Sequence, residues 1–107
     1  MEKKSIERVS QKGQFAEFRI TEQFEDARVF AALAIGRQSS VFDVFVNDVC
    51  ALENLNLNSQ HAGITTPLVD LGIHKPIDNA FVVRFEFSGR HPGERVLSLD
   101  YFRLGAR

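Results

Sequence analysis

Three histidines are the residues of this chain whose chemistry first suggests a metal centre or a catalytic base. His61, His74 and His91 lie far apart in the sequence, each in a polar stretch of its own. A zinc site needs three or four ligands that converge on the ion at about 2.0–2.3 Å, and no close pair of histidines predicts such convergence. We therefore expect each histidine to be a surface loop residue, and we expect no metal site.

Nucleophilic and acid–base catalysis have no better support. Ser59, His61 and Asp70 have the residue types of a catalytic triad, but no nucleophile elbow surrounds them. The single cysteine, Cys50, has apolar neighbours and no base beside it, so we expect a buried, unreactive thiol. Glycosidase chemistry needs two carboxylates that face each other across a cleft, and no pair of acidic residues predicts that arrangement. The sequence therefore predicts a protein that is not an enzyme.

Binding chemistry is better represented, in the segment Glu53–Thr66, which reads ENLNLNSQHAGITT. We expect an ordered surface loop here, because the segment is polar without being of low complexity. Amide side chains offer both donors and acceptors, as sugar hydroxyls require. Alternatively, these amides satisfy the backbone of their own loop through Asx turns. The candidate ligand-binding residues are Asn54, Asn56, Asn58, Gln60 and His61, with Arg37 and Arg90 from other loops.

Composition narrows the classes of partner. The chain has 107 residues, enough for a single domain (1–107) with one core. Its 13 basic and 14 acidic residues are spread evenly, so no basic stripe predicts binding to nucleic acid. No apolar run approaches the length of a membrane span, and no signal-peptide pattern opens the sequence. We expect either a cytoplasmic protein or a domain of a larger, secreted parent protein on which it docks.

Alternating apolar residues near the end of the sequence predict two strands. Phe81, Val83, Phe85 and Phe87 share one face, and the run 97–101 alternates in the same way. The polar break at 88–95 contains two glycines and a proline, so we predict a long β-hairpin that closes the domain. By this alternation the ring of Tyr101 belongs in the core, with its hydroxyl at the margin.

Earlier segments predict further strands. Phe15–Ile20 and Val41–Val46 alternate, and the second is followed by a two-residue turn at Asn47–Asp48. Glu22–Ile35 has fair helix propensity, but its apolar run favours a buried strand. Lys3–Val9 is either an edge strand or a single helical turn. Seven or eight strands with turn signals between them predict an all-β, antiparallel β-sandwich.

Several ordered motifs resemble one known family. The sequence has FVND at Phe45–Asp48, VDLG at Val69–Gly72, NAFVVRFEFSG at Asn79–Gly89 and LDYFRL at Leu99–Leu104. This order is similar to that of the galactose-binding-like β-sandwich, a jelly-roll domain of carbohydrate-binding modules and of accessory domains in bacterial glycoside hydrolases. The resemblance implies a non-catalytic module with carbohydrate as its partner.

The chain also departs from that family. Val49 stands where the family usually has a glycine after the turn, and the loops contain no Trp or Tyr to stack on a sugar. Some relatives hold a structural calcium ion near the chain ends, which would implicate Glu2, Glu7 and Asp100. We expect these carboxylates to be solvated and the chain to need no cofactor.

A structural role is the alternative. Ten phenylalanines are more than a small core obviously needs, and rings left on the outer face of a sheet would mark an interface. A self-assembling jelly roll, a homo-oligomer without a small-molecule ligand, would then cover them.

Overall fold

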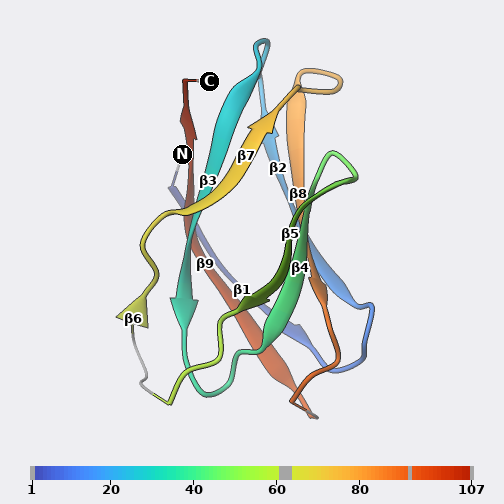
Figure 1. Cartoon of the computed structure of the whole chain (residues 1–107), viewed down its shortest axis with the longest axis vertical. Helices are drawn as coiled ribbons and strands as arrows, with labels where there is room; N and C mark the ends of the chain where they lie inside the picture. The colour runs from blue at the N-terminus through green and yellow to red at the C-terminus, as the bar shows by residue number, and fades with distance from the viewer. Residues whose placement is uncertain (1, 61–63, 92, 107) are drawn as a thin grey trace.

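Two antiparallel sheets pack face to face in the computed structural model of the chain, which describes residues 2–60, 64–91 and 93–106 (Figure 1). The first sheet has the order β1 (Glu2–Val9), β9 (Arg95–Gly105) and β3 (Ala27–Ile35), with β6 (Ile64–Thr65) and β7 (Val69–His74) both paired to the far edge of β3. The second sheet has the order β2 (Phe15–Thr21), β8 (Ala80–Phe87), β4 (Val41–Val46) and β5 (Val49–Asn56).

The strand count and the pairing confirm the predicted fold class. Eight strands are six residues or longer, and β6 adds a two-residue strand. All neighbouring strands within the two sheets run antiparallel. The described residues contain no helix, and so none that could cross a membrane. The chain is an all-β, antiparallel sandwich.

Period-two alternation sets which side chains face the core. In β8, Phe81, Val83, Phe85 and Phe87 are buried, as predicted. In β2 the even-numbered residues are buried and the odd-numbered ones are exposed. In the ambiguous segment 22–35, residues 27–35 form β3 of the first sheet, whereas residues 22–26 lie in the connection from β2. The favoured strand is therefore correct for 27–35. Of the two alternatives for the segment 3–9, the structure has the edge strand.

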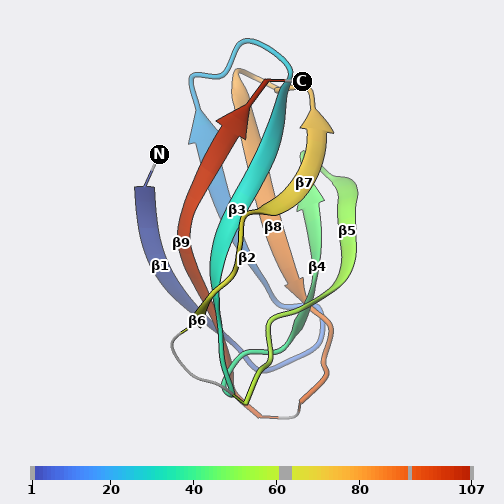
Figure 2. The same cartoon turned by 60° about the vertical axis from the view of Figure 1, so that its left-hand side comes forward.

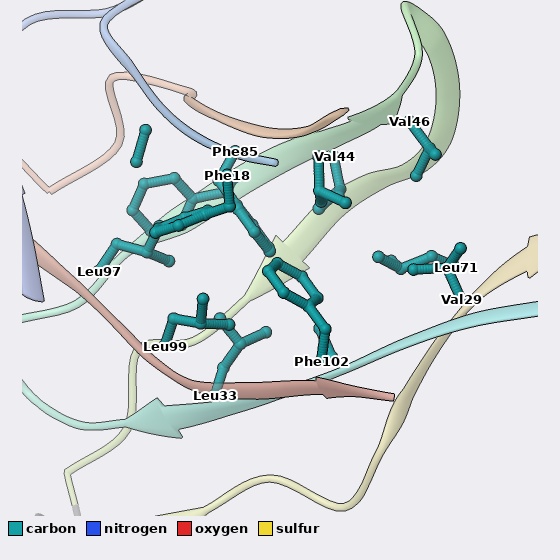
Figure 3. Packing of buried hydrophobic residues seen from close by; sticks show 14 of the residues in the cluster. Phe18, Val29, Leu33, Val44, Val46, Leu71, Phe85, Leu97, Leu99 and Phe102 are labelled. Carbon is teal, nitrogen blue, oxygen red and sulfur yellow. The ribbon is translucent and has the colours of Figure 1, made fainter. Parts of the chain in front are cut away.

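Aromatic rings join the two sheets at the middle of the core (Figure 3). Phe18 of β2 and Phe85 of β8 meet edge to face, with ring centroids 6.0 Å apart. Phe102 of β9 reaches them from the opposite sheet, 5.8 Å from Phe18 and 6.5 Å from Phe85. Leucines of β3 and β9 complete the packing beneath these rings. Each aromatic pair adds about 0.5–1.5 kcal/mol beyond the buried area.

The predicted closing hairpin is wrong. β8 lies in the second sheet between β2 and β4, whereas β9 lies in the first sheet between β1 and β3. Residues 88–94 therefore cross from one sheet to the other and do not form a turn within one sheet. A polar, glycine-containing break suits both kinds of connection, so local sequence does not distinguish them. The turn at Asn47–Asp48 is confirmed, since it joins the paired strands β4 and β5 with φ of 47° and 65°.

The predicted orientation of Tyr101 is also wrong, because β9 contains a bulge. Ala32 pairs with Tyr101 and the next residue, Leu33, pairs with Leu99, which leaves Asp100 as the extra residue. The bulge reverses the alternation beyond Leu99. Phe102 is consequently buried at 3% exposure, and Tyr101 is only half-buried.

Strand β5 is longer than its sequence suggests. It extends to Asn56, so Asn54 and Asn56 lie on a strand and the irregular segment begins after them. β5 is an edge strand of the second sheet, and its pairing with β4 is irregular. Cys50 is exposed on this strand, which corrects the expectation of a buried thiol.

Candidate functional site

Three of the residues predicted to bind a ligand, Arg37, Asn58 and Gln60, lie at the end of the sandwich where β3 and β5 finish. Arg37 Nε donates a hydrogen bond to the carbonyl of Gln60 at 3.0 Å. The Asn58 amide donates to the carbonyls of Arg37 and Ser39 at 3.1 and 2.9 Å. The structure thus brings three predicted residues together, but these donor groups hold the loop backbone.

The remaining predicted residues are dispersed or bonded locally. The side chain of Asn56 accepts from the backbone N–H of Asn58 at 2.9 Å, as in an Asx turn. Asn54 has φ of 56°, and its N–H donates to the Asp43 carboxylate at 2.9 Å. Arg90 is exposed on the 88–94 connection. His61 lies outside the described residues.

A serine–histidine pair lies at the same end, but its geometry does not suit nucleophilic catalysis. Ser40 Oγ is 2.7 Å from the carbonyl of Arg90 and 2.8 Å from Nδ1 of His91. A hydroxyl has one proton, and a carbonyl can only accept, so Ser40 donates to Arg90 and accepts from His91. Ser40 is also fully buried, which keeps a substrate from reaching it. The pair fastens the 88–94 connection to the start of β4.

The other groups considered for catalysis or metal binding are separate. His74 ends β7, and its Nε2 donates to the carbonyl of Leu71 at 2.6 Å, so it is a strand residue. Glu7 is exposed and accepts from the Ser5 hydroxyl at 3.4 Å. Asp100 is half-buried at the β9 bulge, and the side chain of Glu2 is outside the described part. Among the described residues, no three His, Cys, Asp or Glu side chains form a metal-binding group.

A polar hollow of about 280 Å³ opens at the opposite end, on the outer face of the second sheet. β2 and β8 form its floor, and two loops rise beside it. Its lining consists of Glu17, Arg19, Val82 and Arg84 from these strands, Asn47 and Asp48 from the β4–β5 turn, and Ile77 and Asp78 from the β7–β8 connection. This volume is close to the lower limit for small-molecule sites.

Turn chemistry explains how the two loops are held beside the hollow. Asp78 and Asn79 have φ of 51° and 59°, so the β7–β8 connection contains a tight turn of the same left-handed kind as Asn47–Asp48. The Asn47 amide donates to the carbonyls of Lys75 and Ala80 at 3.0 and 3.2 Å. One asparagine therefore joins both turns to each other.

Arg84 connects this hollow to two aromatic rings. Its guanidinium lies 4.6 Å from the ring centroid of Phe45 and 5.8 Å from that of Phe15. The guanidinium of Arg84 also donates a hydrogen bond to Asp48 Oδ1 in the β4–β5 turn, at 2.9 Å. Phe15 remains 55% exposed. The outer face thus presents Phe15, Arg84 and Phe45 side by side on the neighbouring strands β2, β8 and β4. The carboxylate of Asp48 lies beside Arg84 at the β4–β5 turn.

Comparisons of the chain with protein-family models, with curated protein sequences and with solved structures gave no match. The functional assignment therefore depends on the chemistry of the hollow. Three carboxylates and two guanidinium groups line it, so its formal charge is slightly negative. That balance opposes a phosphate or another anion, and it suits a neutral ligand with many hydroxyl groups.

The sequence contained signals for this site that our prediction did not use. Asn47–Asp48 and Asp78–Asn79 are both dipeptides that favour positive φ in tight turns. Glu17, Arg19 and Arg84 are the polar halves of two alternating strands, which places them on one outer face. The proximity of the two turns required tertiary structure, because β4 and β7 belong to different sheets.

Proposed function

We propose that the chain is a non-catalytic carbohydrate-binding or accessory module of the galactose-binding-like, jelly-roll kind. The observation that carries the proposal is the hollow itself, where acidic and basic side chains converge beside exposed aromatic surface. The two-sheet architecture and the order of the sequence motifs support the family assignment. The proposed site lies on the outer face of β2 and β8, and it replaces the asparagine-rich segment as the preferred candidate.

The lining has the functional groups that sugar recognition needs. Carboxylate oxygens of Glu17 and Asp78 accept hydrogen bonds from neighbouring hydroxyls, and the Arg19 guanidinium donates to hydroxyl oxygens. Charge-assisted hydrogen bonds of this kind contribute about 1.5–3 kcal/mol each. The positive C–H edges of a sugar ring are attracted to the negative face of an aromatic ring, and Phe15 offers exposed aromatic surface nearby.

A glycan array followed by thermal-shift assays tests the proposal. We expect at least one neutral mono- or oligosaccharide to raise the melting temperature of the wild-type protein by mass action. The variants Glu17→Gln and Asp78→Asn keep the shape of the lining, and each removes one negative charge from it. Each should weaken the affinity for that sugar about tenfold, the equivalent of one lost charge-assisted bond.

Gln60→Ala provides the matched control, because Gln60 is exposed at the other end of the sandwich. It should leave sugar affinity unchanged. The absence of any response across neutral glycans would contradict the proposal. Equal losses in Gln60→Ala and in the hollow variants would contradict the location of the site.

A further inference from the structure

The open edge of β2 is the most regular strand edge of the sandwich. β2 pairs with β8 through seven consecutive residues without a register shift, and no other strand of the described residues pairs with it (Figure 2). The pairings of the edge strands β1, β5 and β7 all contain shifts, and β6 has only two residues. Bulges and shortness are the usual protections against edge-to-edge association. Among the described edge strands, only β2 has neither a register shift nor a short length.

The hydrogen-bonding groups that β2 leaves open follow from its pairing. Phe87 N donates to the carbonyl of Gln14 at 2.8 Å, so the carbonyl of residue 14 faces β8, whereas its N–H donates to the carbonyl of Gln11 at 3.0 Å. Successive residues of an antiparallel strand alternate in this respect. The N–H and C=O groups of the odd-numbered residues, Phe15, Glu17, Arg19 and Thr21, therefore point to the open edge.

The sequence of β2 is complementary to itself in the antiparallel direction. A two-fold axis at Phe18 places Glu17 opposite Arg19 of a second copy and Phe15 opposite Thr21. The carbonyl of Thr21 already accepts from the side-chain amide of Gln23 at 2.8 Å. The pairing therefore forms about six hydrogen bonds, two for each Glu17–Arg19 pair and one for each Phe15–Thr21 pair. Glu17 and Arg19 are both exposed and on the same face, which allows two cross-strand ion pairs.

We propose that the β2 edge is the dimerisation surface of this chain and that its occupant is a second copy in this register. Other registers that align open backbone groups are less favourable. An axis at Glu17 sets two glutamates opposite each other, and an axis at Arg19 sets two arginines opposite each other. Like charges directly opposite on neighbouring strands are destabilising. Charge therefore selects the axis at Phe18.

Such a dimer joins the two four-stranded sheets into one continuous sheet of eight strands. Phe15 is covered in part by Thr21 of the second copy. Both hollows then open on the same face of the joined sheet, on either side of the axis, since Glu17 and Arg19 line the hollow as well. The dimer does not depend on the proposed sugar ligand, although it would present two sites to one polysaccharide chain.

Charge-reversal variants test this surface, with the dimerisation constant measured by sedimentation equilibrium. We expect the wild-type chain to form a dimer with twice the monomer mass. Glu17→Lys sets lysine opposite Arg19, and Arg19→Glu sets glutamate opposite Glu17. Each variant should dimerise at least about tenfold more weakly than the wild type, because two attractive pairs become repulsive.

The two variants should nevertheless associate with each other. In a mixture of Glu17→Lys and Arg19→Glu chains, both facing pairs are again of opposite charge, so a one-to-one heterodimer forms. Glu7→Lys makes the same charge change on β1, the edge strand of the other sheet, and it should dimerise as strongly as the wild type. A monomeric wild type, undiminished self-association of the single variants, or failure of the mixture to associate would each overturn the proposal.

Hydrogen exchange gives a readout that needs no variant. The amide protons of Glu17 and Arg19 should be protected at high protein concentration and should exchange faster on dilution, whereas the amides of β1 should not respond. Exchange of the β2 amides that is independent of concentration would also overturn the proposal.

Discussion

Asn47 and Val82 form two hydrogen bonds with each other, which join the β4–β5 turn to strand β8. The Asn47 N–H donates to the Val82 carbonyl at 2.9 Å, and the Val82 N–H donates to Asn47 Oδ1 at 2.8 Å. The side chain of Asn47 thus continues the β4–β8 ladder past the end of β4. Because its amide also reaches Lys75 and Ala80, this residue holds the walls of the hollow in place.

Replacing Asn47 with glycine should destabilise the fold by about 2–4 kcal/mol, because several backbone groups lose their partner. Glycine keeps the positive φ at this position, so the loss reports the side chain alone. The measurement is urea denaturation of Asn47→Gly. The control is Asp48→Gly at the next turn position, whose side chain is largely exposed. Its expected change is within about 0.5 kcal/mol, and a comparable loss in both variants would contradict the role of Asn47.

Phe102→Ala should cost about 3–5 kcal/mol, because the ring is buried between Phe18 and Phe85. Tyr101→Ala should cost only about 1 kcal/mol, in proportion to its half-buried ring. Thermal or chemical denaturation of the two variants gives the comparison. A larger loss for Tyr101→Ala would mean that β9 lacks its bulge and alternates without interruption.

Gly89→Ala tests the connection between the sheets. Gly89 has φ of 85°, and an added Cβ would lie 2.9 Å from Cβ of Lys12. Gly13→Ala is the control, because Gly13 has φ of 90° with no atom within 4 Å of an added Cβ. We expect Gly13→Ala to cost about 1–2 kcal/mol from the backbone alone. Gly89→Ala should cost about 1–3 kcal/mol more in the same denaturation experiment, because of crowding. Equal losses would show that Lys12 does not crowd this position.

The sequence predicted the strands well because burial imposes a local signal. The alternation at Phe81–Phe87 and Phe15–Ile20 arises because one face of the sheet packs on the core and the other faces solvent. The burial pattern of these strands confirms it. The sheet to which each strand belongs has no such local signal. The break at 88–95 was therefore interpreted as a hairpin, although β8 and β9 belong to different sheets.

The errors in side-chain orientation have a single physical cause. The extra residue at Asp100 inverts the alternation of β9, and the irregular pairing of β5 leaves Cys50 exposed at an edge. A bulge shifts which residues face the core without changing composition. The same limit applies to the candidate site. The asparagine-rich segment was visible in the sequence, whereas the hollow arises from turns that meet only in three dimensions.

Chemical-shift mapping by NMR with a neutral sugar selected on the array is the most direct measurement. If the hollow binds the sugar, saturable shifts are expected at the amides of Glu17, Arg19, Asp48, Asp78 and Arg84, with none at Asn54–Gln60. Shifts confined to Asn54–Gln60, or no saturable shifts with any neutral sugar, would contradict sugar binding at the hollow.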